Sequence, residues 1–163
     1  MLSVTQARDK AEMLVSQARA AGAEAADVIY VGEQSSGVQV RKGALEDVHR
    51  SEGEELGLRV FLGTQSATVA SSDLSDEALS ALVGRVLAMA REAPEDPYAG
   101  LAPADLLMNG EPPELDNWDG EEPDPAALKA RALTAEGAAL GVAGVSNSNG
   151  CTATASGSPK PVR

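Results

Sequence analysis

The sequence has few of the side chains on which catalytic and metal sites depend, since its 163 residues include one cysteine and one histidine. One cysteine cannot form an internal disulfide, which favours a reducing, intracellular compartment. One histidine excludes a complete zinc site built from two histidines and a carboxylate of this chain alone. Aromatic residues number only four, so the core must be built mainly from Ala, Val and Leu.

Basic residues are also scarce, because 13 Lys and Arg stand against 25 Asp and Glu and give a net charge of −12. Affinity for phosphate backbones comes largely from Lys and Arg, so we expect no nucleic-acid partner. We interpret the acidic surface as a solubility device that can also steer basic partners. No signal-peptide pattern or run of about 18 apolar residues is present, so we expect a soluble, cytoplasmic protein with no membrane partner.

The clearest strand pattern lies in residues 55–71, where the even-numbered positions from Leu56 to Leu62 are apolar. Gly63-Thr64 then predicts a type II′ turn into an antiparallel strand over residues 65–71. Strand-like runs also cover residues 28–33, 37–41 and 45–50, with turn residues at 34–36, 42–43 and 51–54. The pattern predicts an antiparallel meander of about five strands.

Three helices flank this meander. The first is capped by Ser3 or Thr5 and ends at Gly22, and the second runs from the Ser75 cap to Ala93 before Pro94. The third begins at Asp124-Pro125 and continues towards Gly141 or Gly144. Because the helices precede and follow the strands, we predict an α+β fold with two to three helices packed on one face of the sheet. The expected buried positions are Val4, Ala7, Ala11, Leu14, Val15 and Ala18, then Leu79, Leu82, Val83, Val86, Leu87 and Ala90, then Leu128, Ala132, Ala135 and Ala139.

We predict four segments along the chain. Residues 1–93 form the helix, meander and helix core, and residues 94–123 form an acidic, Pro-rich connection with one short helical turn near residues 103–107. Residues 124–150 hold the third helix and the start of a further strand that has no visible partner. Residues 151–163 are expected to be a divergent, disordered tail.

His49 and Cys151 are the first candidates for chemistry. His49 lies in a strand-like stretch, and we interpret it as a half-exposed structural histidine. Cys151 has no basic neighbour to lower its pKa, so we interpret it as an unactivated thiol. The segment GVSNSNG, residues 144–150, lacks a G-x-S-x-G nucleophile elbow because Ser148 stands where the second glycine would be.

Acid–base and nucleotide sites are equally weak candidates. Asp73, Asp76 and Asp96 could pair as acid and base, but Asp73 and Asp76 are more simply explained as residues at the start of a helix. The glycines at 137, 141 and 144 have the wrong spacing and context for a dinucleotide-binding loop. We therefore predict no catalytic, cofactor-binding or metal-ligating residue in this chain.

Several segments taken in order carry a family resemblance: LGLRVFLGTQSATVASSDLS, REAPEDPYAGLA, the acidic connection, a helix and GVSNSNG. Together they resemble the N-terminal domain of the TldD/PmbA family, and more closely its PmbA (TldE) type, over nearly the whole chain to about Gly150. An older description of the family is modulator of DNA gyrase.

The resemblance implies a cytoplasmic zinc metallopeptidase system in which TldD-like and TldE-like subunits pair and act on peptides or unfolded segments. In that family the zinc motif H-E-x-x-x-H belongs to the TldD partner, and it is absent here, so no catalytic residue carries over and zinc is expected only on that partner. Family members continue into a C-terminal β domain, so we expect the chain to be truncated at SGSPKPVR.

Three hypotheses follow from these observations. The first is a non-catalytic N-terminal domain that serves as a scaffold and binds a TldD-like subunit or forms a homo-oligomer. The second is a stand-alone peptide- or protein-interaction module that uses a sheet edge lacking proline and charge. The third is a truncated gene product without activity.

Overall fold

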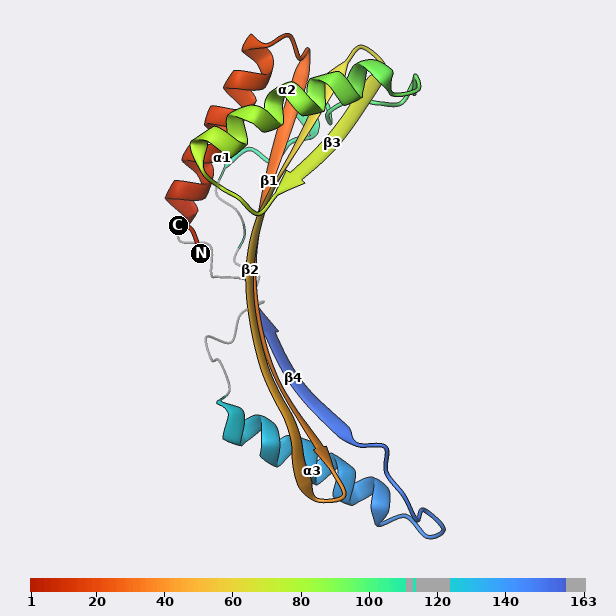
Figure 1. Ribbon diagram of the computed structural model, residues 1–163. Helices are drawn as coiled ribbons and strands as arrows, with labels where there is room; N and C mark the ends of the chain where they lie inside the picture. Colours follow the sequence, from red (N-terminus) through yellow and green to blue (C-terminus); the bar gives the residue numbers. More distant parts are fainter. Residues whose placement is uncertain (111–112, 114–123, 158–163) are drawn as a thin grey trace. The chain divides into compact units, whose positions relative to one another are not determined.

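The computed structural model describes residues 1–110, 113 and 124–157, and these residues form an α+β fold, as the sequence predicted (Figure 1). Four strands make one sheet in the order β3-β2-β1-β4. The elements are α1 (Val4–Ala20), β1 (Ala25–Arg41), β2 (Ala44–Leu62), β3 (Gln65–Ser71), α2 (Asp76–Glu92), the 3-10 helix η1 (Ala104–Leu106), α3 (Pro125–Leu140) and β4 (Cys151–Gly157).

The chain divides into two compact units, which we describe separately. Among the described residues, unit 1 contains residues 1–32, 54–110 and 113, and unit 2 contains residues 33–53 and 124–157. The long strands β1 and β2 contribute to both units. Each unit therefore has its own helices and its own apolar core.

The first helix of unit 1 is fixed at both ends by its sequence. The Ser3 hydroxyl accepts a hydrogen bond from the Gln6 N–H, and the Gln6 side chain accepts one from the Ser3 N–H, which completes a capping box. At the other end Gly22 has φ +107°, and the Ala23 N–H reaches the carbonyl of Ala18. The Gly22 stop was predicted, and Ser3 was one of the two predicted caps.

The second helix of unit 1 covers the sheet as its apolar pattern predicted. Figure 1 shows α2 beside α1 and over β3. Ser75 caps α2, and every residue of its predicted stripe is buried. The stripe packs on the inward side of β2 with α1, through Leu14 and Ala18. The core residues contributed by α2 and β2 are Leu79, Leu82, Val83, Val86, Leu87 and Ala90, and Leu56, Leu58 and Val60.

The turn between β2 and β3 also agrees with the sequence. Gly63 has φ +58°, as the first central position of a type II′ turn requires, and Leu62 pairs with Gln65. The short helical turn expected after the second helix is present as η1. Most of the looser stretch expected from Asn109 to Glu122 lies outside the described residues.

The strand count was overestimated. We expected turns at residues 34–36 and 51–54, but β1 and β2 run through both segments without a break, so four strands replace the expected five. Residues 34–37 pair with residues 154–157 of β4, and this pairing keeps them extended despite their turn-forming composition. A local turn signal is overridden here by a partner more than a hundred residues away.

The end of the chain also differs from the expectation. We expected a strand to begin before Gly150 and a disordered tail from 151, but residues 145–150 are irregular and residues 151–157 form β4. This strand has a partner, because it pairs antiparallel with β1 from Val40↔Cys151 to Gln34↔Gly157. In unit 2 the strands are covered by α3 through Leu128 and Ala132. Residues 158–163 of the expected tail lie outside the described residues.

The third helix begins as predicted, and Leu128 and Ala132 are buried as predicted, but the other two expected core positions are not. The Asp124 carboxylate accepts a hydrogen bond from the Ala127 N–H at 2.7 Å, and Pro125 opens the helix. Ala135 and Ala139 are exposed, whereas Glu136 is only 3% exposed. The buried positions 128, 132 and 136 follow one another at steps of four, and Glu136 is buried because it has partners in the β1-β2 turn.

Candidate functional site

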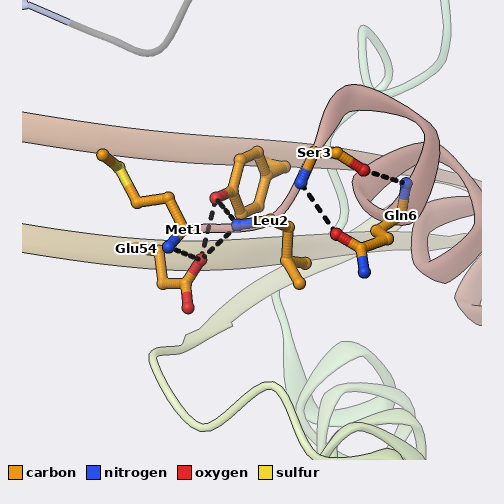
Figure 2. Close-up of polar contacts among 6 residues, drawn as sticks. Met1, Leu2, Ser3, Gln6 and Glu54 are labelled. Atoms are coloured by element: carbon orange, nitrogen blue, oxygen red, sulfur yellow. Dashed lines mark hydrogen bonds and ion pairs between the residues drawn. The ribbon is translucent and has the colours of Figure 1, made fainter.

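A polar cluster in unit 1 joins the start of the chain to β1 and β2. The Tyr30 hydroxyl donates to Glu54 Oε2 at 2.9 Å, and the Leu2 N–H lies 3.1 Å from the Tyr30 oxygen and 3.0 Å from Glu54 Oε2. Figure 2 shows Glu54 facing the backbone of Met1 and Leu2, which directly precede the Ser3–Gln6 capping box. The cluster therefore ties α1 to the two long strands.

The electrostatics of this cluster favour an ionised carboxylate beside a neutral phenol. The hydrogen bond from Tyr30 is the main reason that the pKa of Glu54 lies below its usual range, and the Leu2 N–H and the terminal ammonium act in the same direction. Burial, followed by the hydrogen bond to Glu54, raises the pKa of Tyr30. These hydrogen bonds hold the start of the chain on β1 and β2, so the cluster stabilises the fold.

A second polar cluster, in unit 2, holds the tip of the β1-β2 hairpin. Lys42 and Gly43 form its two-residue turn with φ values of +51° and +76°, the signs of a type I′ turn. The Glu136 carboxylate of α3 accepts the N–H groups of Lys42 at 2.8 Å and of Gly43 at 2.9 Å. The hydrogen bond from Gly43, followed by one from the Ser148 side chain, lowers the pKa of Glu136.

Glu136 was missed by the sequence analysis, although two signals for it were available. It follows Leu128 and Ala132 at helical steps of four, and a Lys-Gly turn leaves two N–H groups in need of an acceptor. The cluster positions the turn, α3 and the segment at Ser148 relative to one another inside unit 2. It is a structural clasp, because the backbone N–H groups satisfy both carboxylate oxygens.

His49 lies on the wall of a pocket in unit 2 with a volume of about 450 Å³. The pocket is bounded by Ser36, Val48 and the N-terminal turn of α3 at Pro125 and Leu128. The His49 side chain is 48% exposed, in agreement with the half-exposed position expected from the sequence. Its Nδ1 atom lies 3.6 Å from Asp47.

The glycine at 37 is required by this histidine. A Cβ at Gly37 would stand closer than 3 Å to the His49 imidazole and 2.9 Å from Cγ2 of Thr154. The His49 ring therefore lies close to the β1 backbone at Gly37, and Thr154 of β4 is near the same point. This packing explains why a histidine stands at position 49, and no observation supports His49 as a metal ligand.

The three aspartates considered as an acid–base set are engaged separately. Asp73 accepts the Ser75 N–H at 3.0 Å, and this bond lowers its pKa. Asp76 pairs with Lys10 of α1 at 2.7 Å, and Asp96 accepts the Tyr98 N–H at 2.9 Å. Asp73 and Asp76 thus act at the start of α2, which is the simpler of the two readings made from the sequence.

Cys151 and Ser148 likewise serve the fold. Cys151 opens β4 and is half-buried against the core of unit 2, in contrast to the disordered tail that we expected from this residue on. The Ser148 hydroxyl accepts the Gly150 N–H at 3.0 Å. Within residues 1–110, 113 and 124–157, no group of three His, Cys, Asp or Glu side chains could hold a metal ion. That part of the chain also has no helix long and apolar enough to cross a membrane.

The two edge strands have the surface features of recognition elements. Neither β3 nor β4 contains a proline or a charged residue. Natural sheets usually protect their edges with such residues, because an unprotected edge can pair with another strand. In unit 1 the segment after α2 also exposes large apolar side chains, with Tyr98, Leu106 and Met108 exposed by 93%, 74% and 62%.

The strands and helices define an α+β domain, and comparison with known proteins gives its family. Residues 26–90 match the model described as PmbA/TldA metallopeptidase domain 1. The metalloprotease PmbA homolog of Haemophilus influenzae is 32% identical over 146 residues, which cover 89% of this chain and 32% of that protein. Metalloprotease PmbA of Escherichia coli O157:H7 is 34% identical over 103 residues, which cover 63% of this chain and 23% of that protein.

Solved structures show the same fold. A protein designated a modulator of DNA gyrase from Bacteroides thetaiotaomicron superposes with a TM-score of 0.73 at 16% identity, covering 91% of this chain and 33% of that one. TldE from Thermococcus kodakarensis superposes with a TM-score of 0.64 at 12% identity, covering 80% of this chain and 29% of that one.

The chain therefore carries the first domain of the PmbA/TldD family and is of the PmbA (TldE) type, as the resemblance predicted. It spans about a third or less of the length of the curated relatives that it matches.

Proposed function

We propose that this chain is the non-catalytic N-terminal domain of a TldE/PmbA-like subunit. In this proposal it serves as a scaffold and a partner-binding surface in a cytoplasmic zinc metallopeptidase system that acts on peptides or unfolded segments. A TldD-like subunit is the partner and carries the zinc. The single observation that carries the proposal is the match of residues 26–90 to the first domain of a metallopeptidase family whose curated relatives are named metalloprotease PmbA.

Two features of the chain support a scaffold role. The Glu54 and Glu136 carboxylates accept hydrogen bonds from backbone N–H groups and from the Tyr30 hydroxyl, and these bonds fix the neighbouring elements in position. The exposed apolar side chains of Tyr98, Leu106 and Met108 offer a surface that a protein partner would cover. The sequence has one histidine and no H-E-x-x-x-H motif.

The test is co-expression of the tagged chain with a TldD-like protein from the same cell. We expect the two proteins to co-purify and the chain alone to hold no stoichiometric zinc and to hydrolyse no peptide. Zinc content is measured after chelation and dialysis, and peptide hydrolysis is measured for the chain, the partner and the complex. Stoichiometric zinc on the chain alone would contradict the proposal. Failure of a folded chain, checked by circular dichroism, to associate with its partner would also contradict it.

A matched pair of variants locates the partner surface. Leu106→Ser removes an exposed apolar side chain from the segment after α2, and Met89→Ser does the same on α2, where the side chain is 46% exposed. We expect Leu106→Ser to weaken co-purification and Met89→Ser to leave it unchanged. Equal effects of the two substitutions would show that this segment is not the contact.

A second candidate function is a stand-alone interaction module that binds through a sheet edge. The observation in its favour is that β3 and β4 both lack proline and charge. Binding of the purified chain to a strand-forming polypeptide, in the absence of any TldD-like protein, would test it. A chain that binds nothing through either edge would exclude this function.

A further inference from the structure

Two Asn-Gly pairs, Asn109-Gly110 and Asn149-Gly150, offer the same chemistry in different surroundings. Asparagine is a thermolabile residue, because the backbone nitrogen of the next residue can attack its side-chain amide. Glycine at the next position favours this attack, since it has no Cβ to hinder the closure of a ring. The sequence therefore gives two equal candidates for a spontaneous modification, and the structure distinguishes them.

The first pair lies in irregular backbone after η1. Asn109 and Gly110 are both exposed, and a Cβ added at Gly110 would have nothing within 4 Å. Among the described residues, neither of the two has a hydrogen-bond partner. The Gly110 N–H is therefore accessible to solvent base, and the backbone around it leaves room for the Asn109 side chain to approach.

The second pair is held by its surroundings in unit 2. The Gly150 N–H donates to Ser148 Oγ at 3.0 Å. A Cβ at Gly150 would stand 3.0 Å from the carbonyl oxygen of Val40, so the backbone at this point is packed against β1. Ser148 is held in turn, because its side chain hydrogen-bonds to the Glu136 carboxylate. The nitrogen that would attack Asn149 is thus engaged, although the Asn149 side chain is itself exposed.

We propose that Asn109 is a site of spontaneous deamidation and that the contacts of Gly150 protect Asn149 from the same reaction. The Gly110 nitrogen gives its proton to solvent base and forms a bond to Cγ of Asn109. The bond from Cγ to the side-chain nitrogen then breaks, and that nitrogen takes up a proton and leaves as ammonia. Water opens the resulting cyclic imide, giving aspartate by attack at the side-chain carbonyl or isoaspartate by attack at the main-chain carbonyl. The net reaction consumes one water and releases one ammonia.

The product alters an exposed apolar segment of unit 1. Leu107 and Met108 directly precede Asn109 and are 55% and 62% exposed. Aspartate at position 109 adds a negative charge beside them, and isoaspartate also lengthens the backbone by a methylene group. This chemistry does not depend on the proposed function, since it needs only water and this chain.

Peptide mapping by mass spectrometry, after incubation of the full chain at mildly alkaline pH, measures the loss of amide at each asparagine. An isoaspartyl methyltransferase with a labelled methyl donor detects isoaspartate. We expect Asn109 to deamidate several times faster than Asn149, and the peptide that contains position 109 to become labelled. Asn109→Gln is the matched control and should remove the label from that peptide, because glutamine would have to close a larger ring.

Two comparisons show whether the structure causes the difference in rate. Ser148→Ala removes the acceptor of the Gly150 N–H, so it should speed the deamidation of Asn149 and leave the rate at Asn109 unchanged. Circular dichroism shows whether this variant is folded, and an unchanged rate at Asn149 in the folded variant would contradict the role of Ser148. In guanidinium chloride, where both pairs are unfolded, we expect the two rates to converge. This second comparison needs no variant.

Three results would overturn the proposal. The first is an intact Asn109 in the folded chain over a period in which the unfolded chain deamidates there. The second is an equal rate at Asn109 and Asn149 in the folded chain. The third is a slower rate at Asn149 that persists in the unfolded chain, which would assign the difference to the flanking sequence and not to the fold.

Discussion

The substitution Tyr30→Phe tests whether the Glu54 cluster holds the start of the chain on the long strands. It removes only the hydroxyl, which donates to Glu54 at 2.9 Å and accepts from the Leu2 N–H at 3.1 Å. A hydrogen bond to a charged group contributes about 1.5–3 kcal/mol and one between neutral groups about 0.5–1.5 kcal/mol. In the variant the Leu2 N–H still donates to Glu54. Because the Glu54 side chain is 31% exposed, water can replace the lost hydrogen bond from the Tyr30 hydroxyl in part.

We therefore expect Tyr30→Phe to lower the free energy of unfolding by about 1–2 kcal/mol. Urea unfolding followed by circular dichroism at pH 7 measures it. Tyr98→Phe is the matched control, since Tyr98 is the other tyrosine and is 93% exposed, and its effect should stay within about 0.5 kcal/mol. If the two substitutions cost the same, the cluster does not stabilise the chain and the reasoning is refuted.

The pH dependence gives a second readout of the same cluster. The Tyr30 hydrogen bond holds the pKa of Glu54 below its ordinary value of 4.5 in the folded chain. A depressed folded-state pKa gives stability that is present above 4.5 and is lost as the pH falls through the lower folded-state value. The difference in free energy of unfolding between wild type and Tyr30→Phe should thus have its full value at pH 7 and shrink at strongly acid pH. A difference that grows on acidification would contradict the assignment.

Three further substitutions test the cores and the unit 2 clusters. Leu58→Ala in the fully buried core of unit 1 should cost about 2–5 kcal/mol in urea unfolding. Glu136→Gln should lower the melting temperature and increase amide hydrogen exchange at the Lys42-Gly43 turn, because a neutral amide is a weaker acceptor for two N–H groups. Unchanged hydrogen exchange at this turn would show that Glu136 does not hold it in place. Gly37→Ala should lower the melting temperature, because the added methyl group collides with the His49 imidazole. Adding His49→Ala to this variant should restore much of the lost melting temperature. If the double variant melts no higher than Gly37→Ala alone, the collision with His49 is not the cause of the destabilisation.

Features set by neighbouring residues could be predicted from the sequence. The stripe of α2 was identified in full because six apolar residues recur at helical spacing between a Ser75 cap and Pro94. The Gly63 turn was identified because few residues other than glycine accept its positive φ. These signals lie within a few residues of the element that they determine.

Features set by residues far apart in the sequence could not be predicted. Residues 34–36 have the composition of a turn and residues 151–157 that of a tail, yet each segment gives the other its strand partner. Neither segment reveals this pairing by its own pattern, because the partner strands are more than a hundred residues apart and share a core with α3. Glu136 continues the spacing of Leu128 and Ala132, but a glutamate in an Ala-rich helix is normally exposed, and the pairing with the distant turn at Lys42 and Gly43 that buries it was not predicted.

The interpretation of the net charge also changes with the structure. From the sequence, −12 was interpreted as an overall solubility device, but the acidic excess among the described residues falls almost entirely in unit 1. A basic partner would be attracted to unit 1, and its association would slow as salt shortens the Debye length to about 8 Å at 0.15 M. Binding of an extended peptide at the β4 edge, the second candidate function, would involve backbone groups and uncharged side chains of β4, so it should change little with salt. Salt dependence therefore separates the two kinds of partner: association that weakens steeply with salt belongs to the acidic surface of unit 1, and association that persists belongs to the β4 edge.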